Sequence, residues 1–213
     1  MPSTDILGPT MTDHLDSRAR STSVRVALVR HGETDWNVEG RLQGSSDIPL
    51  NDIGRSQART AAAALADDSW DTLVSSPLSR ASETADIIGH VIGLTRSADH
   101  EDLMERRFGR AEGMTGYEAW AYWPDGDYPG AESHEALAER GRRRLDLLAD
   151  ENPGRSLVAV AHGGIIRAVL RSITGHPAPR IANAGVSIVV RDDDGWSVRT
   201  VNSVPVRHGR RLR

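Results

Sequence analysis

Apolar residues in this chain gather in a few short unbroken runs separated by longer, more polar stretches. The runs from Val24 to Val29 and from Ser156 to Ala161 are almost wholly apolar, and a shorter run lies between Asp71 and Ser76. Runs of this length are typical of strands buried on both faces of a sheet. Two further runs, Val186 to Val190 and Trp196 to Val201, flank the polar turn sequence DDDG. This arrangement predicts a closing β-hairpin.

The stretches between the runs have the spacing of amphipathic helices. An alanine-rich segment from Asn51 to Ala66 begins at residues that favour a helix N-cap. After the second run, Pro77 suits the first position of another helix. The apolar face of that helix would carry Ala81, Ala85, Ile88 and Ile92. The other predicted helices are a long one from Ser133 to Asp150, one that opens at His162 and ends at Gly175, and a short one from Thr115 to Trp123.

Strands that alternate with helices predict a single α/β domain. We expect three layers, α/β/α, with a mainly parallel central sheet and one closing antiparallel edge. The domain should span residues 23–204, with an insertion at about 109–130 that acts as a lid. Residues 1–22 are polar and predict a disordered leader, and residues 205–213 predict a basic tail. In such a fold, ligands bind beyond the carboxyl ends of the parallel strands.

The composition of the chain limits the classes of binding partner and the cellular compartment that we expect. The formal net charge of -4 over 213 residues does not favour a nucleic-acid partner. No apolar stretch approaches the roughly 20 residues of a membrane span, and the first 22 residues lack the apolar core of a signal peptide. We therefore expect a cytoplasmic protein with no membrane partner. The absence of cysteine excludes disulfides, thiolate metal sites and cysteine nucleophiles.

All 26 basic residues are arginines, because the chain contains no lysine. This excludes Schiff-base chemistry and the phosphate-binding lysine of P-loop proteins. Any anion site must therefore use arginine, histidine or backbone N–H groups. A genomic bias toward arginine codons explains the missing lysine equally well.

Four basic or titratable side chains follow the predicted parallel strands. Arg30 and His31 come at the end of the first run, Arg80 lies one turn into the helix after the second, and His162 follows the third. Parallel strands bring their carboxyl ends to one edge, so we expect a cationic pocket whose natural occupant is a phosphoryl group. Taken singly, His162 is more often a structural hydrogen-bonder and Arg80 a surface charge. A second Arg-His-Gly tripeptide, at 207–209, lies in the tail, and we interpret it as chance.

Four longer segments resemble a known family. They are LVRHGETDWNVEGRLQGSSDIPLNDIGRSQA, SSPLSRASETA, LMERRFGRAEGMT and VAHGGIIRAVL. Their order, spacing and flanking residues resemble the signatures of the histidine phosphatase superfamily, also called the phosphoglycerate mutase-like family. The resemblance covers about Val24 to Val201. It implies an enzyme that acts on phosphomonoesters and needs neither a metal nor another cofactor.

The resemblance also implies a role for the matched side chains. His31 would be the nucleophile and would form a phosphohistidine. Arg30, Arg80 and His162 would hold the phosphoryl oxygens and stabilise the transition state. Glu105 would protonate the leaving oxygen and then activate water. Without the family pattern, Glu105 is one more charge in a charged segment.

The remaining matched positions are expected to line the phosphate or substrate pocket. They are Gly32, Asn37, Gln43, Gly44, Arg106 and Gly163. Gly32 would let the backbone approach the phosphoryl group closely, whereas we interpret Trp36 as a packing residue. The two histidines lack carboxylates at metal-ligand spacing, so the sequence predicts no metal site.

The family contains phosphatases and cofactor-dependent mutases. The mutases carry a longer insertion with lysine, ERHYG at the acid and HGNS at the second histidine, whereas this chain has ERRFG from Glu105 and HGGI from His162. These differences favour a phosphatase acting on a small phosphorylated metabolite, although Arg106 and Arg107 leave a phosphoglycerate mutase open. A non-catalytic module that binds a phospho-ligand is a third alternative. The sequence also leaves the oligomeric state open, a homodimer included.

Aromatic residues are concentrated in the predicted lid. They are Trp120, Tyr122, Trp123 and Tyr128. They either pack the lid over the edge of the sheet or form an apolar wall for the non-phosphate part of the substrate.

Overall fold

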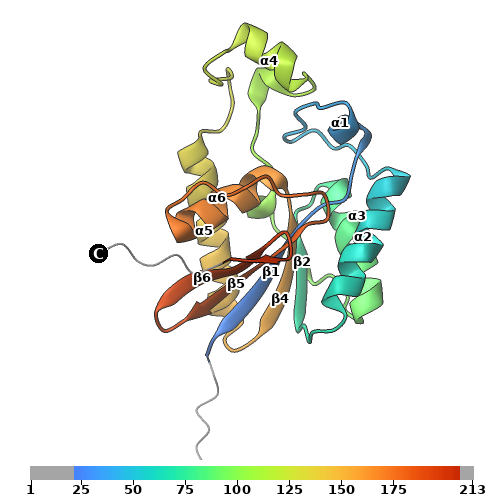
Figure 1. The fold of residues 1–213 in the computed structure, drawn as a ribbon, viewed down its shortest axis with the longest axis vertical. Helices are drawn as coiled ribbons and strands as arrows, with labels where there is room; N and C mark the ends of the chain where they lie inside the picture. Colours follow the sequence, from blue (N-terminus) through green and yellow to red (C-terminus); the bar gives the residue numbers. More distant parts are fainter. Residues whose placement is uncertain (1–21, 207–213) are drawn as a thin grey trace, which may run out of the picture.

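The computed structural model describes residues 22–206, which form a seven-stranded sheet with helices on both faces (Figure 1). The strand order is β3-β2-β4-β1-β5-β6-β7; β1 to β4 pair in parallel, and β5 to β7 close the sheet antiparallel. The strands are β1 (Val24–Arg30), β2 (Thr72–Ser75), β3 (Ala98–Asp99), β4 (Ser156–Ala161), β5 (Val186–Asp192), β6 (Gly195–Val201) and β7 (Val204–Pro205). The predicted α/β fold is confirmed. The sequence missed only β3 and β7, which are too short to show a pattern.

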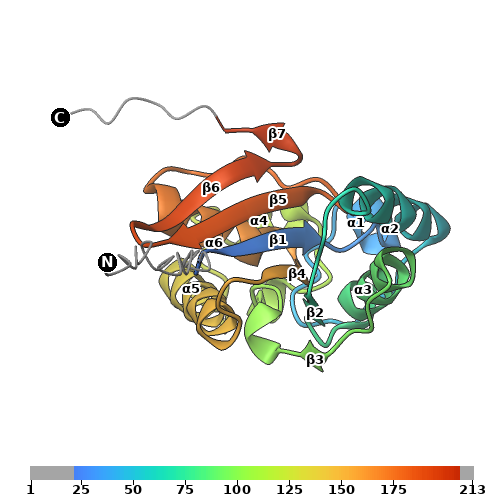
Figure 2. The ribbon, with the colours of Figure 1, turned by 90° about the horizontal axis from the view of Figure 1, so that it is seen from below.

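The two faces of the sheet carry separate hydrophobic cores. In β1, Val26 and Leu28 belong to one core, and Ala27 and Val29 belong to the other, because successive side chains of a strand point to opposite faces. The first core is covered by α5 (His134–Glu151) and α6 (Gly163–Thr174), and the second by α2 (Asp52–Leu65) and α3 (Ser79–Ile92). Figure 2 shows these two helix pairs on opposite sides of the sheet.

The beginning of α3 differs from the prediction. Pro77 does not occupy the first helical position, because the helix begins at Ser79 after an extended Leu78. The side chain of Asp47 accepts a hydrogen bond of 2.7 Å from the Ser79 backbone N–H. A residue remote in sequence therefore satisfies a free N–H of the first turn, which no local pattern reveals. By contrast, α2 begins where predicted, with Asn51 as its N-cap.

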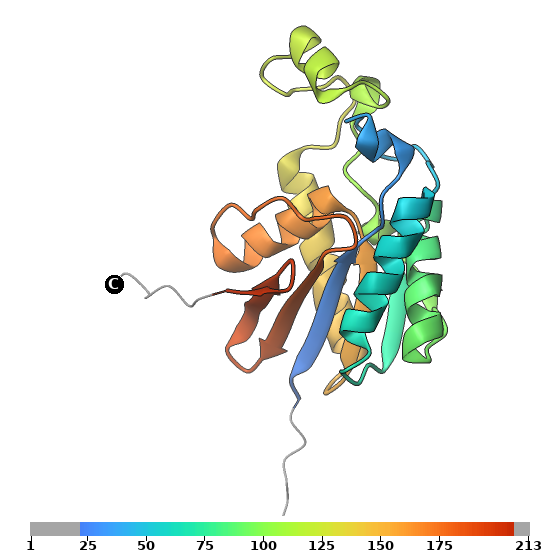
Figure 3. The ribbon, with the colours of Figure 1, turned by 45° about the vertical axis from the view of Figure 1, so that its right-hand side comes forward.

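The insertion stands beyond the carboxyl edge of the sheet, at the end of the molecule that also holds α1 (Asp35–Val38) (Figures 1 and 3). It contains a 3-10 turn (Gly109–Ala111) and α4 (Gly116–Tyr122), which begins at a capping box between Thr115 and Glu118. A bridge between Arg41 and Thr115 ties it to the segment after α1. The predicted short helix is therefore present.

The predicted ends of the domain are described only in part. Pro205, which we assigned to the basic tail, pairs in β7 instead, because its neighbour Val206 donates to the Arg199 carbonyl at 2.9 Å. The rest of the predicted tail, with its tripeptide at 207–209, lies outside the described residues, and so do residues 1–21 of the predicted leader. Within residues 22–206 there is no helix long and apolar enough to cross a membrane.

Candidate active site

The carboxyl ends of three adjacent parallel strands bring the predicted pocket together. Arg30 is the last residue of β1 and His31 follows it, while His162 follows β4. Because β1 pairs with β4 and β4 with β2, the first residue after β2, Ser76, meets them at the same edge. The rings of His31 and His162 lie with their centroids 5.1 Å apart.

His31 is buried, and a backbone carbonyl of the next residue orients its ring. Its Nδ1 lies 2.6 Å from the carbonyl oxygen of Gly32. A carbonyl only accepts hydrogen bonds, so Nδ1 carries the proton and Nε2 keeps its lone pair. Burial, together with the charges of Arg80 and Arg30, holds the pKa of His31 well below its ordinary value. At neutral pH the ring is therefore neutral.

His162 is fully buried beside His31. Its Nε2 lies 2.8 Å from the hydroxyl oxygen of Ser76, while its Nδ1 has no hydrogen-bond partner in the described structure. Burial, and then the charge of Arg80, lowers the pKa of His162 well below its ordinary value. Sequence reasoning missed Ser76, because a serine at a strand end has many ordinary uses.

Arg80 is a fully buried cation in the first turn of α3. Its terminal nitrogens donate to the backbone carbonyls of Ser46, at 2.7 Å, and Gly44, at 2.9 Å. Burial lowers the pKa of Arg80 to about 10, although the carboxylates of Glu105 and Asp47 act in the opposite direction. The guanidinium is therefore charged at neutral pH, and Arg80 is not the surface charge that it would most often be if taken singly.

Arg30 reaches the pocket from the end of β1. One terminal nitrogen donates to the Ile181 carbonyl at 2.8 Å. Burial lowers the pKa of Arg30, and the nearby carboxylate of Glu105 partly offsets this. A Cβ added to Gly163 would lie 3.3 Å from Arg30 Nε, so a side chain there would crowd the guanidinium.

Unpaired buried polar atoms are concentrated in this pocket. Among the described residues five buried side-chain nitrogens or oxygens have no partner, and four of them lie on Arg30 Nε, Arg80 Nε, His162 Nδ1 and Gln43 Oε1. Leaving such a group unsatisfied costs about 1–3 kcal/mol. Two of the four are guanidinium donors, which suit the oxygens of a phosphoryl group. These unpaired atoms therefore lie among the residues for which the sequence predicts an anion site.

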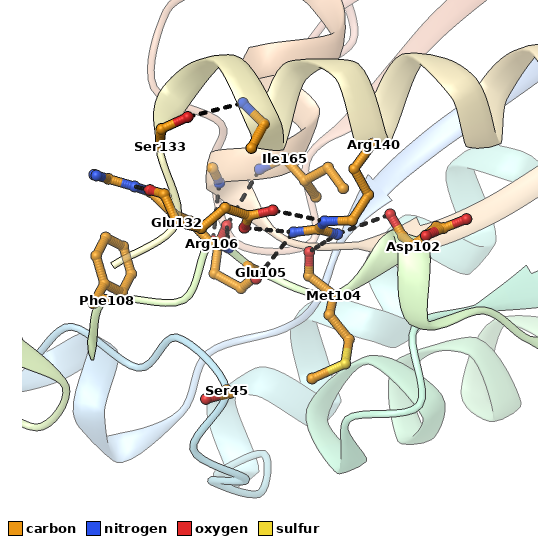
Figure 4. A network of polar contacts seen from close by, with 12 residues as sticks. Ser45, Asp102, Met104, Glu105, Arg106, Phe108, Glu132, Ser133, Arg140 and Ile165 are labelled. Carbon is orange, nitrogen blue, oxygen red and sulfur yellow. Dashed lines mark hydrogen bonds and ion pairs between the residues drawn. The ribbon is translucent and has the colours of Figure 1, made fainter. Parts of the chain in front are cut away.

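Glu105 lies at the edge of the pocket, bound to the first turn of α6 (Figure 4). Its Oε2 accepts a hydrogen bond from Gly164 N at 2.9 Å, and its Oε1 accepts from Ile165 N at 3.2 Å and Arg106 N at 2.9 Å. These backbone N–H groups hold the Glu105 side chain in a fixed position at the N-terminus of α6. A Cβ at Gly164 would lie 2.3 Å from Glu105 Oε1, so this approach requires glycine.

A buried ion pair supports the segment that carries Glu105 (Figure 4). Arg140 of α5 binds both carboxylate oxygens of Glu132 and also donates to the carbonyls of Asp102 and Met104, at 2.9 Å and 3.0 Å. Burial alone would raise the pKa of Glu132, but its hydrogen bonds and ion pair with Arg140 lower it. Sequence reasoning missed this pair, because nothing in the local pattern separates Arg140 from the other arginines of α5.

Two of the predicted glycines are also required by close packing. A Cβ at Gly32 would lie 2.3 Å from the Gly54 carbonyl, and the Gly32 N–H donates to Thr84 Oγ1 at 3.1 Å. Gly32 therefore makes room for α2, and its close approach to a phosphoryl group stays a prediction. Gly44 has a φ of 53°, and a Cβ there would meet the carboxylate of Glu112 at 2.1 Å.

The other predicted substrate residues lie around the pocket. Asn37 uses its side-chain oxygen to accept from Thr34 N at 3.2 Å and from Asn183 Nδ2 at 2.9 Å. Arg106 is buried, donates from Nε to the Glu132 carbonyl at 2.8 Å, and packs its guanidinium over Phe108. Asn183 and Phe108 were not predicted, because each acts only through these tertiary contacts.

The aromatic residues of the insertion divide into two groups. Tyr128 packs against Phe108 and Trp123, with ring centroids 6.3 Å and 5.9 Å apart, whereas Trp120 and Tyr122 are largely exposed. Trp36 lies against Gly113 of the insertion, as expected of a packing residue. In the part of the chain that the structure describes, no group of three or more His, Asp or Glu residues is arranged to hold a metal ion.

The fold is α/β, and two buried histidines and two buried arginines lie at the carboxyl edge of its parallel strands. The chain belongs to the histidine phosphatase superfamily (branch 1), whose family model matches residues 26–204. The predicted family is therefore confirmed, and the chain is an enzyme of the phosphatase class.

Individual relatives agree with this assignment. The chain is 39% identical to the uncharacterized phosphatase PhoE of Bacillus subtilis, over 83% of this chain and 93% of the relative. It is 31% identical to a metal-independent phosphoserine phosphatase of Arabidopsis thaliana, over 89% and 85% of the two chains. The structure of mycobacterial glucosyl-3-phosphoglycerate phosphatase superposes with a TM-score of 0.76 at 30% identity, covering 83% of this chain and 97% of that one.

Proposed function

We propose that this phosphatase hydrolyses phosphomonoesters of a small metabolite through a phosphohistidine on His31, without a metal ion. The observation that carries the proposal is the hydrogen bond between His31 Nδ1 and the Gly32 carbonyl. It leaves the lone pair on Nε2, and the lowered pKa of His31 keeps the ring neutral and nucleophilic at neutral pH.

The reaction has two steps. In the first, Nε2 of His31 attacks phosphorus, and the bond from phosphorus to the leaving oxygen breaks as Glu105 gives that oxygen a proton. Arg30, Arg80 and His162 bind the three peripheral phosphoryl oxygens and stabilise their charge. In the second step, Glu105 accepts a proton from water, the water oxygen attacks phosphorus, and Nε2 leaves. The products are the alcohol and inorganic phosphate.

Three kinds of observation support a phosphatase on a small metabolite over the alternatives. Relatives named for phosphoserine and glucosyl-3-phosphoglycerate support a small phosphorylated substrate. The absence of lysine and the short insertion argue against a cofactor-dependent phosphoglycerate mutase. The presence of His31, Glu105 and three unpaired phosphoryl-binding atoms in one pocket argues against a module that only binds.

A trapping experiment tests the nucleophile. The protein is mixed with a phosphomonoester that carries radioactive phosphate and is quenched in base. We expect acid-labile label on the wild type and on His90→Ala, an exposed histidine of α3, and none on His31→Ala. Label that survives in His31→Ala would contradict the proposal. An assay for interconversion of 2- and 3-phosphoglycerate with the same preparation separates a mutase from a phosphatase.

A further inference from the structure

A groove of about 610 Å³ opens beside Glu105, between the outer face of α6 and the first turns of α5. Its apolar part includes Phe108 and Leu137, and its polar part includes Arg106, Arg167 and Arg171. Apart from Arg106, which was expected to bind substrate, none of these residues was predicted to have a functional role. The groove is large enough for a small metabolite.

The position of the groove links it to the leaving group. Gly164 forms part of its wall, and the N–H of this same glycine donates to Glu105 Oε2 at 2.9 Å. In the proposed reaction Glu105 faces the leaving oxygen. The alcohol part of the substrate must therefore extend from Glu105 into the groove.

The arginines of the groove differ from those on the adjoining helix. In α5, four arginines form ion pairs with carboxylates, namely Arg140, Arg142, Arg143 and Arg144. Within residues 22–206, Arg106, Arg167 and Arg171 form no ion pair. The backbone instead orients two of them: Arg106 Nε donates to the Glu132 carbonyl at 2.8 Å, and Arg167 Nε donates to the Ala178 carbonyl at 3.3 Å.

The remaining titratable groups of the groove do not cancel this charge. Glu135 is the one acidic residue among those that line it, and it accepts hydrogen bonds at the N-terminus of α5. Burial, and then the charges of Arg106 and the two arginines of α6, lowers the pKa of His134, which is therefore neutral at neutral pH. Three guanidinium groups thus face one carboxylate, and the groove is cationic.

We propose that this groove binds an anionic group, a carboxylate or a second phosphate, on the alcohol part of the substrate. Arginine forks match the oxygens of both groups. The substrate class would then be phosphomonoesters of small acidic alcohols. The inference rests on the proposed function, because Glu105 fixes which end of the substrate enters the groove.

Matched substrate pairs test the proposal. 3-Phosphoglycerate and glycerol 3-phosphate differ in a carboxylate, whereas fructose 1,6-bisphosphate and fructose 6-phosphate differ in a second phosphate. We expect the wild type to prefer at least one acidic member by about 10-fold or more in kcat/KM, the size of one charged hydrogen bond. The pair that shows the preference identifies the anionic group.

Variants assign that preference to the groove. In the double variant Arg167→Gln/Arg171→Gln, the ratio of kcat/KM for the acidic over the neutral substrate should fall by about 10-fold, mainly through KM. Arg59→Gln, an exposed arginine on α2, is the matched control and should keep the ratio. Equal turnover of both members of each pair by the wild type, or an unchanged ratio in the double variant, would overturn the proposal.

A binding measurement tests anion binding in the groove independently of catalysis. Calorimetry of 3-phosphoglycerate and fructose 1,6-bisphosphate with His31→Ala protein needs no turnover. We expect the double variant to bind the preferred acidic compound about 10-fold more weakly in that background. If no phosphomonoester is hydrolysed, p-nitrophenyl phosphate included, the proposed function fails, and the calorimetry alone decides whether the groove binds anions.

Discussion

The guanidinium of Arg140 binds both carboxylate oxygens of Glu132, at 2.9 Å and 2.8 Å, with only 6% of the Glu132 side chain exposed. The same guanidinium donates to the carbonyls of Asp102 and Met104. It thus joins α5 to the segment that ends in Glu105, which makes Arg140 a positioning residue for the proposed acid.

We predict that Arg140→Lys impairs the reaction more for alkyl phosphates than for p-nitrophenyl phosphate. Lysine keeps the charge but cannot reach both carboxylate oxygens and two carbonyls at once. Glu105 would then move, and only a poor leaving group needs its proton. Single-turnover rates with the two substrates measure the difference.

The control for this prediction is Arg142→Lys, whose pair with Asp146 is more exposed. That variant should behave as the wild type does. A more severe change, Arg140→Gln, removes the charge and breaks a largely buried ion pair. It should lower the free energy of unfolding by about 3–5 kcal/mol. A uniform loss for both substrates in Arg140→Lys, with unchanged leaving-group dependence, would mean that Arg140 has no positioning role.

Glu105→Gln should remove the proton donor while it keeps the size of the side chain. We expect a loss of the order of 10²–10⁴-fold in phosphorylation of His31 by alkyl phosphates, and a much smaller loss with p-nitrophenyl phosphate. Single-turnover measurement is required, because the same residue should later activate water. Equal losses with both substrates would leave Glu105 only an ordering role.

Glu112 is an alternative acid, and its carboxylate is held by several hydrogen bonds. It accepts hydrogen bonds from the hydroxyls of Ser45 and Ser46 and from the Phe108 N–H. We therefore expect Glu112→Gln to loosen this loop without the leaving-group dependence predicted for Glu105→Gln.

Stability should fall as the pH drops below about 6.5, the ordinary histidine value. The folded-state pKa of both His31 and His162 is lowered, so the unfolded chain takes up protons that the folded chain refuses. Each histidine contributes a slope of up to about 1.4 kcal/mol per pH unit, with the full stability present above pH 6.5. Urea unfolding at pH 7.5 and 5.5 measures the loss.

A variant isolates this effect from other titrating groups. His31→Gln should show a smaller loss between the two pH values than the wild type, whereas His90→Gln should show the same loss. His100 and His134, whose pKa is also lowered by burial, contribute equally to all three proteins. An unchanged pH dependence in His31→Gln would show that folding does not lower the pKa of this ring.

We expect EDTA to leave the activity unchanged. The positive charge that a divalent ion would supply comes from Arg30 and Arg80, with His162 beside them as a further hydrogen-bonding group. Turnover of p-nitrophenyl phosphate after dialysis against the chelator checks this. Activity that is lost and then restored by Mg²⁺ or Zn²⁺ would contradict the metal-free mechanism.

Local sequence patterns predicted much of this structure. The run from Val24 to Val29 is buried on both sides, so its apolar character alone identified a central strand, and Asn51 identified the start of α2. The same runs predicted His31 and His162 at strand ends. Parallel pairing of the two strands then brings these residues to the same edge of the sheet. These features depend on short-range periodicity and on one general rule for parallel sheets.

The sequence by itself determined the longer strands and helices and the positions of Arg30, His31 and His162 at the carboxyl edge, because each is encoded within a few neighbouring positions. Only the tertiary structure decided which arginines form ion pairs: Arg140 pairs with Glu132, whereas Arg167 and Arg171 form no ion pair within residues 22–206. It also decided that Asp47 caps α3 and that Gly32 makes room for α2. The local sequence does not reveal the role of a charged residue or a glycine. That role depends on the distance to groups that are remote along the chain.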